Sequence, residues 1–189
     1  MLTHDELVEV GRRWLLHPWR NAGAGHSACC LVLTEIVTSA SETPDVIGWN
    51  GYTSIILECK TSVSDFRADA KKFFRVNPDE GMGRQRYYIA PVGVIGEDEV
   101  PEGWGFIEVD DAERVHVRRA SGQFSANQAN ELRVLLSLLR RLKVNAGLHV
   151  AIRAYQHMIE NPRATATFAT SRAPEATRHG RRPEEASVR

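Results

Sequence analysis

Three charged residues stand where a strand that looks buried comes to its end. Residues 54 to 57 read Ser-Ile-Ile-Leu, and the next three residues are Glu-Cys-Lys. Side chains alternate along a strand, so Glu58 and Lys60 share one face. If residues 45 to 49 form a neighbouring strand joined by a tight turn, Asp45 lies near that face as well. The sequence therefore predicts two carboxylates and a lysine at one end of a hairpin.

Such a cluster has the composition of a site that hydrolyses phosphodiesters. Mg²⁺ binds oxygen ligands and needs only one or two carboxylates beside a substrate phosphate. Asp45, Glu58 and the main-chain carbonyl of Cys59 are the candidate metal ligands, and the ion would polarise a water. Lys60 would orient that water or stabilise the developing charge. An exposed Glu58–Lys60 ion pair at a strand end, worth well under about 1 kcal/mol, explains the same residues without chemistry.

The spacing of apolar residues predicts the elements that must position this cluster. Ser62 or Ser64 is expected to cap the helix that follows the third strand, and residues 125 to 128 fit a capping box. The predicted elements are a helix over 4–17, strands over 29–38, 45–49 and 53–60, a helix carrying Phe66 to Phe74, a strand over 86–91, a hairpin over 104–109 and 114–117, and helices over about 125–159. This order predicts an α/β fold with a central mixed sheet flanked by helices.

The totals describe an ordinary globular chain. It has 189 residues, of which 42% are hydrophobic and 25% charged, and its formal net charge is zero. We expect no membrane partner, because no apolar run approaches the roughly 20 residues that span a bilayer. The acidic start, MLTHDELVEV, is unlike a secretory signal, so we expect a cytoplasmic protein. The three cysteines have no zinc-site or disulfide spacing.

A family resemblance covers about residues 30 to 109. The pair Pro44-Asp45 followed by Glu58-Cys59-Lys60 resembles the PD-(D/E)xK signature of the restriction-endonuclease-like superfamily. A closer likeness, to MmcB-like DNA repair proteins and related phage-encoded nucleases, is carried by five strings. They are TEIVT at 34–38, PDVIGW at 44–49, ECKTSVSDFRAD at 58–69, GMGRQRYYIAP at 81–91 and PEGWGFIEV at 101–109. The string ECKxSxxDF followed by RYYxxP is far more specific than the superfamily motif.

The resemblance implies a restriction-endonuclease-like core of order αβββαβ with a C-terminal helical extension, and metal-dependent cleavage of DNA in repair, recombination or phage DNA metabolism. Asp45 and Glu58 would hold Mg²⁺ or Mn²⁺, and Lys60 would be the catalytic lysine. Glu35 matches the glutamate of the first strand and would point inward as an auxiliary acid, with Glu9 and Glu6 as alternatives. A catalytically inactive DNA-binding or protein-interaction module on the same fold remains the alternative function.

Basic residues near the cluster are candidates for contacts to DNA phosphates, although a solvated helix face explains them equally well. They are Arg67, Lys71, Lys72, Arg75, Arg84 and Arg86. A leucine-rich face over 132–142 is expected to be mostly core, and an exposed remainder would allow a homodimer. We expect one domain over 1–160, with its core at about 4–118, and a disordered tail rich in arginine and proline over 161–189.

Overall fold

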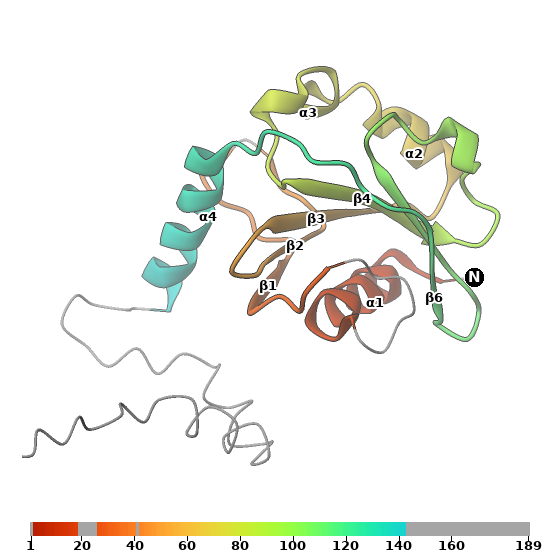
Figure 1. Ribbon diagram of the computed structural model, residues 1–189, viewed down its shortest axis with the longest axis horizontal. Helices are drawn as coiled ribbons and strands as arrows, with labels where there is room; N and C mark the ends of the chain where they lie inside the picture. Colours follow the sequence, from red (N-terminus) through yellow and green to blue (C-terminus); the bar gives the residue numbers. More distant parts are fainter. Residues whose placement is uncertain (1, 19–25, 41, 143–189) are drawn as a thin grey trace, which may run out of the picture. The chain divides into compact units, whose positions relative to one another are not determined.

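The computed structural model describes residues 2–18, 26–40 and 42–142, and it confirms an α/β fold with a six-stranded mixed sheet flanked by helices (Figure 1). The described residues belong to one compact unit, Met1–Gly147. Its helices are α1 (His4–Leu16), α2 (Val63–Asp69), α3 (Phe73–Val76) and α4 (Gln128–Arg141), with 3₁₀ turns η2 (Pro78–Glu80) and η3 (Glu97–Glu99). Its strands are β1 (Leu31–Thr34), β2 (Val46–Trp49), β3 (Ser54–Cys59), β4 (Gln85–Pro91), β5 (Gly105–Val109) and β6 (Val115–Arg119).

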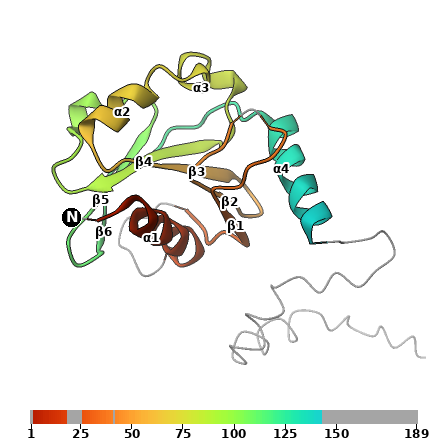
Figure 2. The ribbon, with the colours of Figure 1, turned by 180° about the vertical axis from the view of Figure 1, so that it is seen from behind.

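The strands lie in the sheet in the order of the sequence, from β1 to β6. β2 is antiparallel to both of its neighbours, β1 and β3, whereas β3, β4 and β5 are parallel, and β6 returns antiparallel to β5. A parallel pair needs a crossover connection. Between β3 and β4 this connection carries α2 and α3 across one face of the sheet, while α1 covers the other face (Figures 1 and 2). The crossover segment that follows β3 therefore packs over the same face of the sheet as α2 and α3.

Two apolar cores lie on the two faces. One contains the buried side of α1, including Leu7 and Trp14, packed against Leu57 and other strand residues. Gly11 allows this packing, because a Cβ there would lie only 2.7 Å from a methyl carbon of Leu57. The other core includes Phe66 of α2. The sheet is thus buried on both sides, which explains why β3 is buried along its whole length.

Several predicted boundaries are wrong in informative ways. The first strand is shorter than 29–38 because β1 ends at Thr34, and the next residue, Glu35, has a left-handed φ of 47°. The predicted helix after β3 is interrupted between α2 and α3, although Ser62 does cap α2 by accepting from the amide of Asp65. The capping box over 125–128 is also wrong, since α4 begins at Gln128 and its cap is Asn127. The hairpin predicted after β4 is confirmed as β5 and β6.

A buried glutamate attaches α4 to the sheet. One oxygen of Glu131 accepts from the hydroxyl of Ser54 at 2.8 Å and from the amide of Gly83 at 2.9 Å, and the other accepts from the indole of Trp49 at 3.1 Å. We expect Glu131→Ala to lower the free energy of unfolding by about 1–3 kcal/mol, because it leaves buried donors without an acceptor. Urea unfolding would measure this, and Gln128→Ala on the exposed start of α4 is the control, with a change within about 0.5 kcal/mol. An equal loss in both variants would contradict the assignment.

The apolar face of α4 is only partly covered within the described residues, where Leu132, Leu136, Leu139 and Leu142 are exposed. A homodimer through this face stays a prediction. The helical stretch predicted up to 159, the domain end at 160 and the tail over 161–189 lie outside the described residues. None of the helices described is long and apolar enough to cross a membrane.

Candidate active site

The β2–β3 hairpin brings the two predicted metal ligands to the same level of the sheet. Val46 pairs with Leu57 in the antiparallel register, so Asp45, one residue earlier, lies opposite Glu58. The Asp45 carboxylate accepts a hydrogen bond from the amide of Cys59 at 2.7 Å. This bond fixes the aspartate, whose side chain keeps 21% of its surface exposed. Asp45 is therefore the solvent-accessible member of the pair.

Glu58 and Lys60 form a buried ion pair. The Lys60 Nζ lies 3.3 Å from Glu58 Oε2, and the two side chains are only 4% and 2% exposed. The same ammonium lies 3.4 Å from Asp69 Oδ1 at the end of α2. The simpler interpretation, an exposed ion pair at a strand end, is therefore wrong, because the crossover segment buries these charges.

Arg75 of α3 is the centre of a larger ionic cluster that the sequence did not reveal. Its three guanidinium nitrogens contact three carboxylates: Nη2 lies 2.8 Å from Glu58, Nε lies 2.6 Å from Asp69, and Nη1 lies 3.1 Å from Glu42. The guanidinium also lies over the ring of Trp104, 4.7 Å from its centroid. The Arg75 side chain is 5% exposed. We call Glu42, Glu58, Lys60, Asp69, Lys72 and Arg75 the ionic cluster.

Asp69 receives more partners than any other carboxylate of the ionic cluster. Besides Arg75 and Lys60, it is 2.7 Å from the Lys72 Nζ and accepts from the hydroxyl of Tyr88 at 2.7 Å. Burial alone would raise the pKa of Asp69, but the neighbouring cations, chiefly Arg75, hold it well below its ordinary value. Asp69 is accordingly ionised at neutral pH and neutralises the cations beside Glu58.

The protonation of Lys60 decides its chemical use. Burial acts to lower the pKa of the Lys60 ammonium, but the charges of Glu58 and Asp69 outweigh it and raise the pKa above its ordinary value. Burial raises the pKa of the Glu58 carboxyl, and the charge of Arg75 opposes that rise. Lys60 is thus protonated at neutral pH, and it is suited to stabilise negative charge rather than to accept a proton.

Glu35 and His4 lie at the rim of this site. The Glu35 carboxylate lies 3.5 Å from the His4 Nε2, which lies 3.9 Å from Asp45 Oδ1. The prediction that Glu35 points inward from a strand is wrong, because β1 has ended and its side chain is 58% exposed. The His4 imidazole nevertheless lies between the carboxylates of Glu35 and Asp45. Nothing in the sequence indicated His4 as a site residue.

The alternative acids of α1 are engaged in contacts within the helix. Glu6 forms a capping box with Thr3, and Glu9 pairs with Arg12 at 2.7 Å. Neither has a described contact with Asp45 or Glu58. Among the predicted auxiliary acids, Glu35 is the one that the fold brings toward the predicted ligands.

The six predicted DNA-binding residues divide into an exposed and a buried group. Arg67, Lys71, Lys72 and Arg84 are exposed. Arg86 is fully buried, and its guanidinium donates to the carbonyls of the loop before β4, so it offers nothing to a phosphate in this structure. Arg75 is likewise enclosed in the ionic cluster. The prediction took both arginines for surface residues because a single sequence does not show which basic side chains fold inward.

The donor set at Asp45 and Glu58 fits a hard divalent cation. Two carboxylates from neighbouring strands, with the adjacent main chain at Cys59, match the oxygen ligands that Mg²⁺ uses beside a phosphate. No group of three or more His, Cys, Asp or Glu side chains within the described ranges is arranged to hold a metal. Two carboxylates are sufficient only with further ligands from substrate and water, so this arrangement suits an ion that binds together with its substrate.

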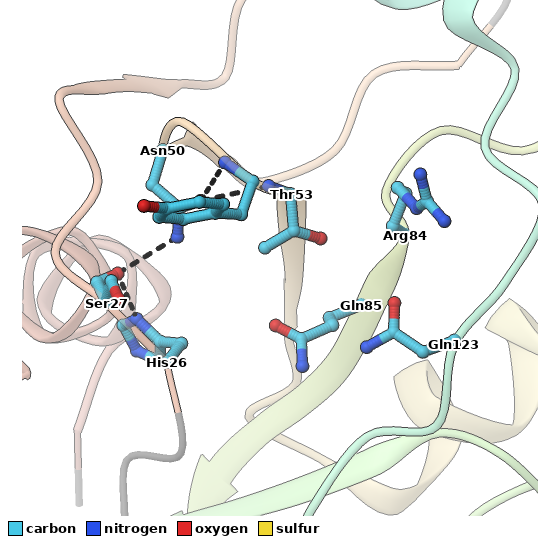
Figure 3. Close-up of a pocket in the computed structure, with 8 residues that line it drawn as sticks. His26, Ser27, Asn50, Thr53, Arg84, Gln85 and Gln123 are labelled. Atoms are coloured by element: carbon cyan, nitrogen blue, oxygen red, sulfur yellow. Dashed lines mark hydrogen bonds between the residues drawn. The ribbon is translucent and has the colours of Figure 1, made fainter.

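A separate hollow of about 340 Å³ lies near the start of β3 and β4, away from the Glu58 end. Figure 3 shows the side chains of Gln85 and Gln123 facing it, with Arg84 beyond them. Asn50 at its edge donates to the carbonyl of Ser27 at 3.1 Å. Of the predicted site residues, Arg84 is the one that lines this hollow.

The low pKa of Asp69 predicts a loss of stability in acid. In the unfolded chain the Asp69 carboxylate takes up a proton near pH 4, whereas in the folded protein it stays ionised. The contribution of Asp69 to the free energy of unfolding is therefore present above that pH and is lost as the pH falls. The free energy of unfolding of the wild type should therefore fall more steeply between about pH 5 and pH 3 than that of Asp69→Asn. Urea unfolding across this range measures the difference. Parallel curves would contradict the prediction.

Comparison with known proteins identifies the fold but not a family. No family model matches the chain, and no curated protein matches it. A solved structure of a protein of unknown function from Silicibacter pomeroyi is similar, with 18% sequence identity and a TM-score of 0.51. The match covers 80% of this chain and 99% of that chain. The chain thus shares the overall fold of that protein.

Proposed function

We propose that this protein is a metal-dependent DNA endonuclease with a restriction-endonuclease-like core. The observation that carries the proposal is the placement of Asp45 opposite Glu58 on neighbouring strands, with the Lys60 ammonium 3.3 Å from the glutamate. A chance motif in the sequence need not produce this geometry. The resemblance of the surrounding strings to MmcB-like DNA repair proteins supports DNA as the substrate, in repair, recombination or phage DNA metabolism.

Different residues of the chain have different roles in the proposed hydrolysis. Asp45 and Glu58, with the carbonyl of Cys59, would hold Mg²⁺ or Mn²⁺, which supplies a polarised water and offsets charge on the phosphate. The amide of Cys59 fixes the orientation of Asp45. Lys60, kept protonated by Glu58 and Asp69, stabilises the negative charge that develops on the phosphate. His4 links Asp45 to Glu35 at the rim.

The exposed basic residues supply the contacts to the DNA backbone under this proposal. Lys71 and Lys72 precede α3, Lys72 is the exposed member of the ionic cluster, and Arg67 lies on α2. Contacts of lysine and arginine with phosphates position a nucleic acid without reading its sequence. Binding through them weakens as salt rises, because counterions are released.

The decisive variant is Asp45→Asn. It keeps an oxygen that accepts from the Cys59 amide but removes the charge that a metal requires, so we expect cleavage to fall by at least about 100-fold. Purified protein would be incubated with linear, nicked and branched DNA in Mg²⁺ or Mn²⁺, and initial rates measured. Glu108→Gln, which removes a carboxylate from β5 that pairs with Arg118, is the matched control and should cut at the wild-type rate. Cleavage that survives Asp45→Asn would refute the assignment.

A second candidate function is a catalytically inactive DNA-binding or interaction module on the same fold. One observation favours it: Glu58 is already neutralised, with Arg75 on one oxygen and Lys60 on the other. Calorimetry with Mn²⁺ separates the two functions. A nuclease should bind Mn²⁺ in the presence of DNA, and the Asp45→Asn variant should lose this binding. An inactive module should bind no Mn²⁺ through Asp45 or Glu58.

A further inference from the structure

The Arg75 guanidinium occupies the position beside Glu58 that a metal ion would need if Glu58 is a metal ligand. Its Nη2 contacts Glu58 Oε1 at 2.8 Å, while the other oxygen, Oε2, faces Lys60 at 3.3 Å and Lys72 at 3.8 Å. Every oxygen of this carboxylate thus has a positive neighbour. A divalent ion can contact Oε1 only if the guanidinium withdraws, since like charges at such distances repel.

The helix that carries Arg75 is poorly anchored apart from the ionic cluster. α3 contains four residues, of which Phe73 and Val76 are exposed, while the Arg75 side chain is enclosed in the ionic cluster. Its neighbours in the sequence are two exposed lysines, Lys71 and Lys72. Few apolar contacts hold this segment, so its attachment depends mainly on the ionic cluster.

The carboxylates that Arg75 would leave behind keep other partners. Asp69 retains Lys60, Lys72 and the hydroxyl of Tyr88. Glu42 retains the amide of Met82 at 2.6 Å. Each of the three carboxylates would lose its closest cation, and Glu58, which retains Lys60 at 3.3 Å, is the one that the proposed metal would bind. Each of the three carboxylates therefore keeps at least one other partner when Arg75 withdraws.

We propose that Arg75 is a positioning residue: in the free protein its guanidinium occupies the position at Glu58 where the metal ion would bind, and it leaves that position when DNA binds. A backbone phosphate offers the guanidinium a bidentate partner, and Lys71 and Lys72 bring the phosphate to the same segment. The exchange makes binding of metal and DNA cooperative: DNA draws Arg75 away, and Glu58 becomes free for the ion. This inference rests on the proposed nuclease function, which it extends to the order in which metal and substrate bind.

The test is calorimetric titration with Mn²⁺, with and without a phosphorothioate duplex that resists cleavage. In the wild type, DNA should tighten Mn²⁺ binding by about 5-fold to 150-fold, the usual range of coupling between sites. Arg75→Gln should tighten Mn²⁺ binding without DNA by a similar factor and lose most of the DNA effect. Arg118→Gln is the matched control, because it removes a cation that contacts Glu108 instead, and it should behave as the wild type.

A folded Arg75→Gln protein with wild-type Mn²⁺ affinity and the full DNA effect would overturn the inference. If that variant does not fold, hydrogen exchange on the wild type decides: Mn²⁺ with DNA should reduce protection in α3 but not in α4, and unchanged protection in α3 overturns the inference. Failure of the nuclease proposal looks different. In that case Asp45→Asn leaves the Mn²⁺ titration unchanged, with or without DNA.

Discussion

Arg75→Ala should lower the free energy of unfolding by about 3–5 kcal/mol, as expected when one partner of a buried ionic network is removed. The guanidinium is the shared cation of Glu42, Glu58 and Asp69, and it also lies against the Trp104 ring. Truncation leaves three buried carboxylates with fewer compensating charges and removes the ion pair that joins α3 to Glu58 of β3. The loss therefore exceeds what an exposed arginine contributes.

Urea unfolding followed by tryptophan fluorescence measures this loss. Arg67→Ala is the control, because its guanidinium is 68% exposed and pairs with Glu99 at the surface. We expect its effect to be a small fraction of that of Arg75→Ala, since water already solvates both charges. Similar effects in the two variants would show that the ionic cluster does not stabilise the fold as described.

Lys60→Met should reduce the rate of DNA cleavage by about 10²–10³-fold, the usual effect of removing one group that stabilises developing charge. Methionine keeps most of the length of lysine, so the space at the end of β3 stays filled. Glu58 and Asp69 keep Arg75, which limits the effect on folding. The change should therefore fall mainly on the chemical step.

Single-turnover rates at saturating DNA separate that step from binding. Arg118→Met is the control, because this arginine pairs with Glu108 on the distant edge of the sheet and should leave the rate unchanged. A variant of Lys60 that folds, binds DNA and cuts at the wild-type rate would remove this lysine from the mechanism.

Much of the fold could be predicted from local pattern. The apolar run of β3 and the turn before it predict the hairpin, and the hairpin by itself fixes Asp45 opposite Glu58. Period-3.6 spacing predicts α1 within one residue of its end. These features depend on neighbours in the sequence, which is why a single chain reveals them.

The ionic cluster could not be predicted in the same way. Its members come from a loop at Glu42, from the end of β3, and from the crossover segment that carries Asp69, Lys72 and Arg75. Only the packing of α2 and α3 over the sheet joins them, and periodicity gives no information about which charged side chain turns inward. The basic spacing around Arg75 and Arg86 is equally typical of a solvated face, so both were predicted as surface residues. A signal was nevertheless present at Asp69, an acid within the string ECKTSVSDFRAD.

The most direct measurement is the position of Mn²⁺ in a crystal of the protein with a non-cleavable duplex, located by its anomalous scattering. We expect one ion about 2.0–2.2 Å from oxygens of both Asp45 and Glu58 and beside a DNA phosphate, with Arg75 moved away from Glu58. An ion bound elsewhere, or a duplex bound while Arg75 still holds Glu58 and no metal reaches the two carboxylates, would contradict it.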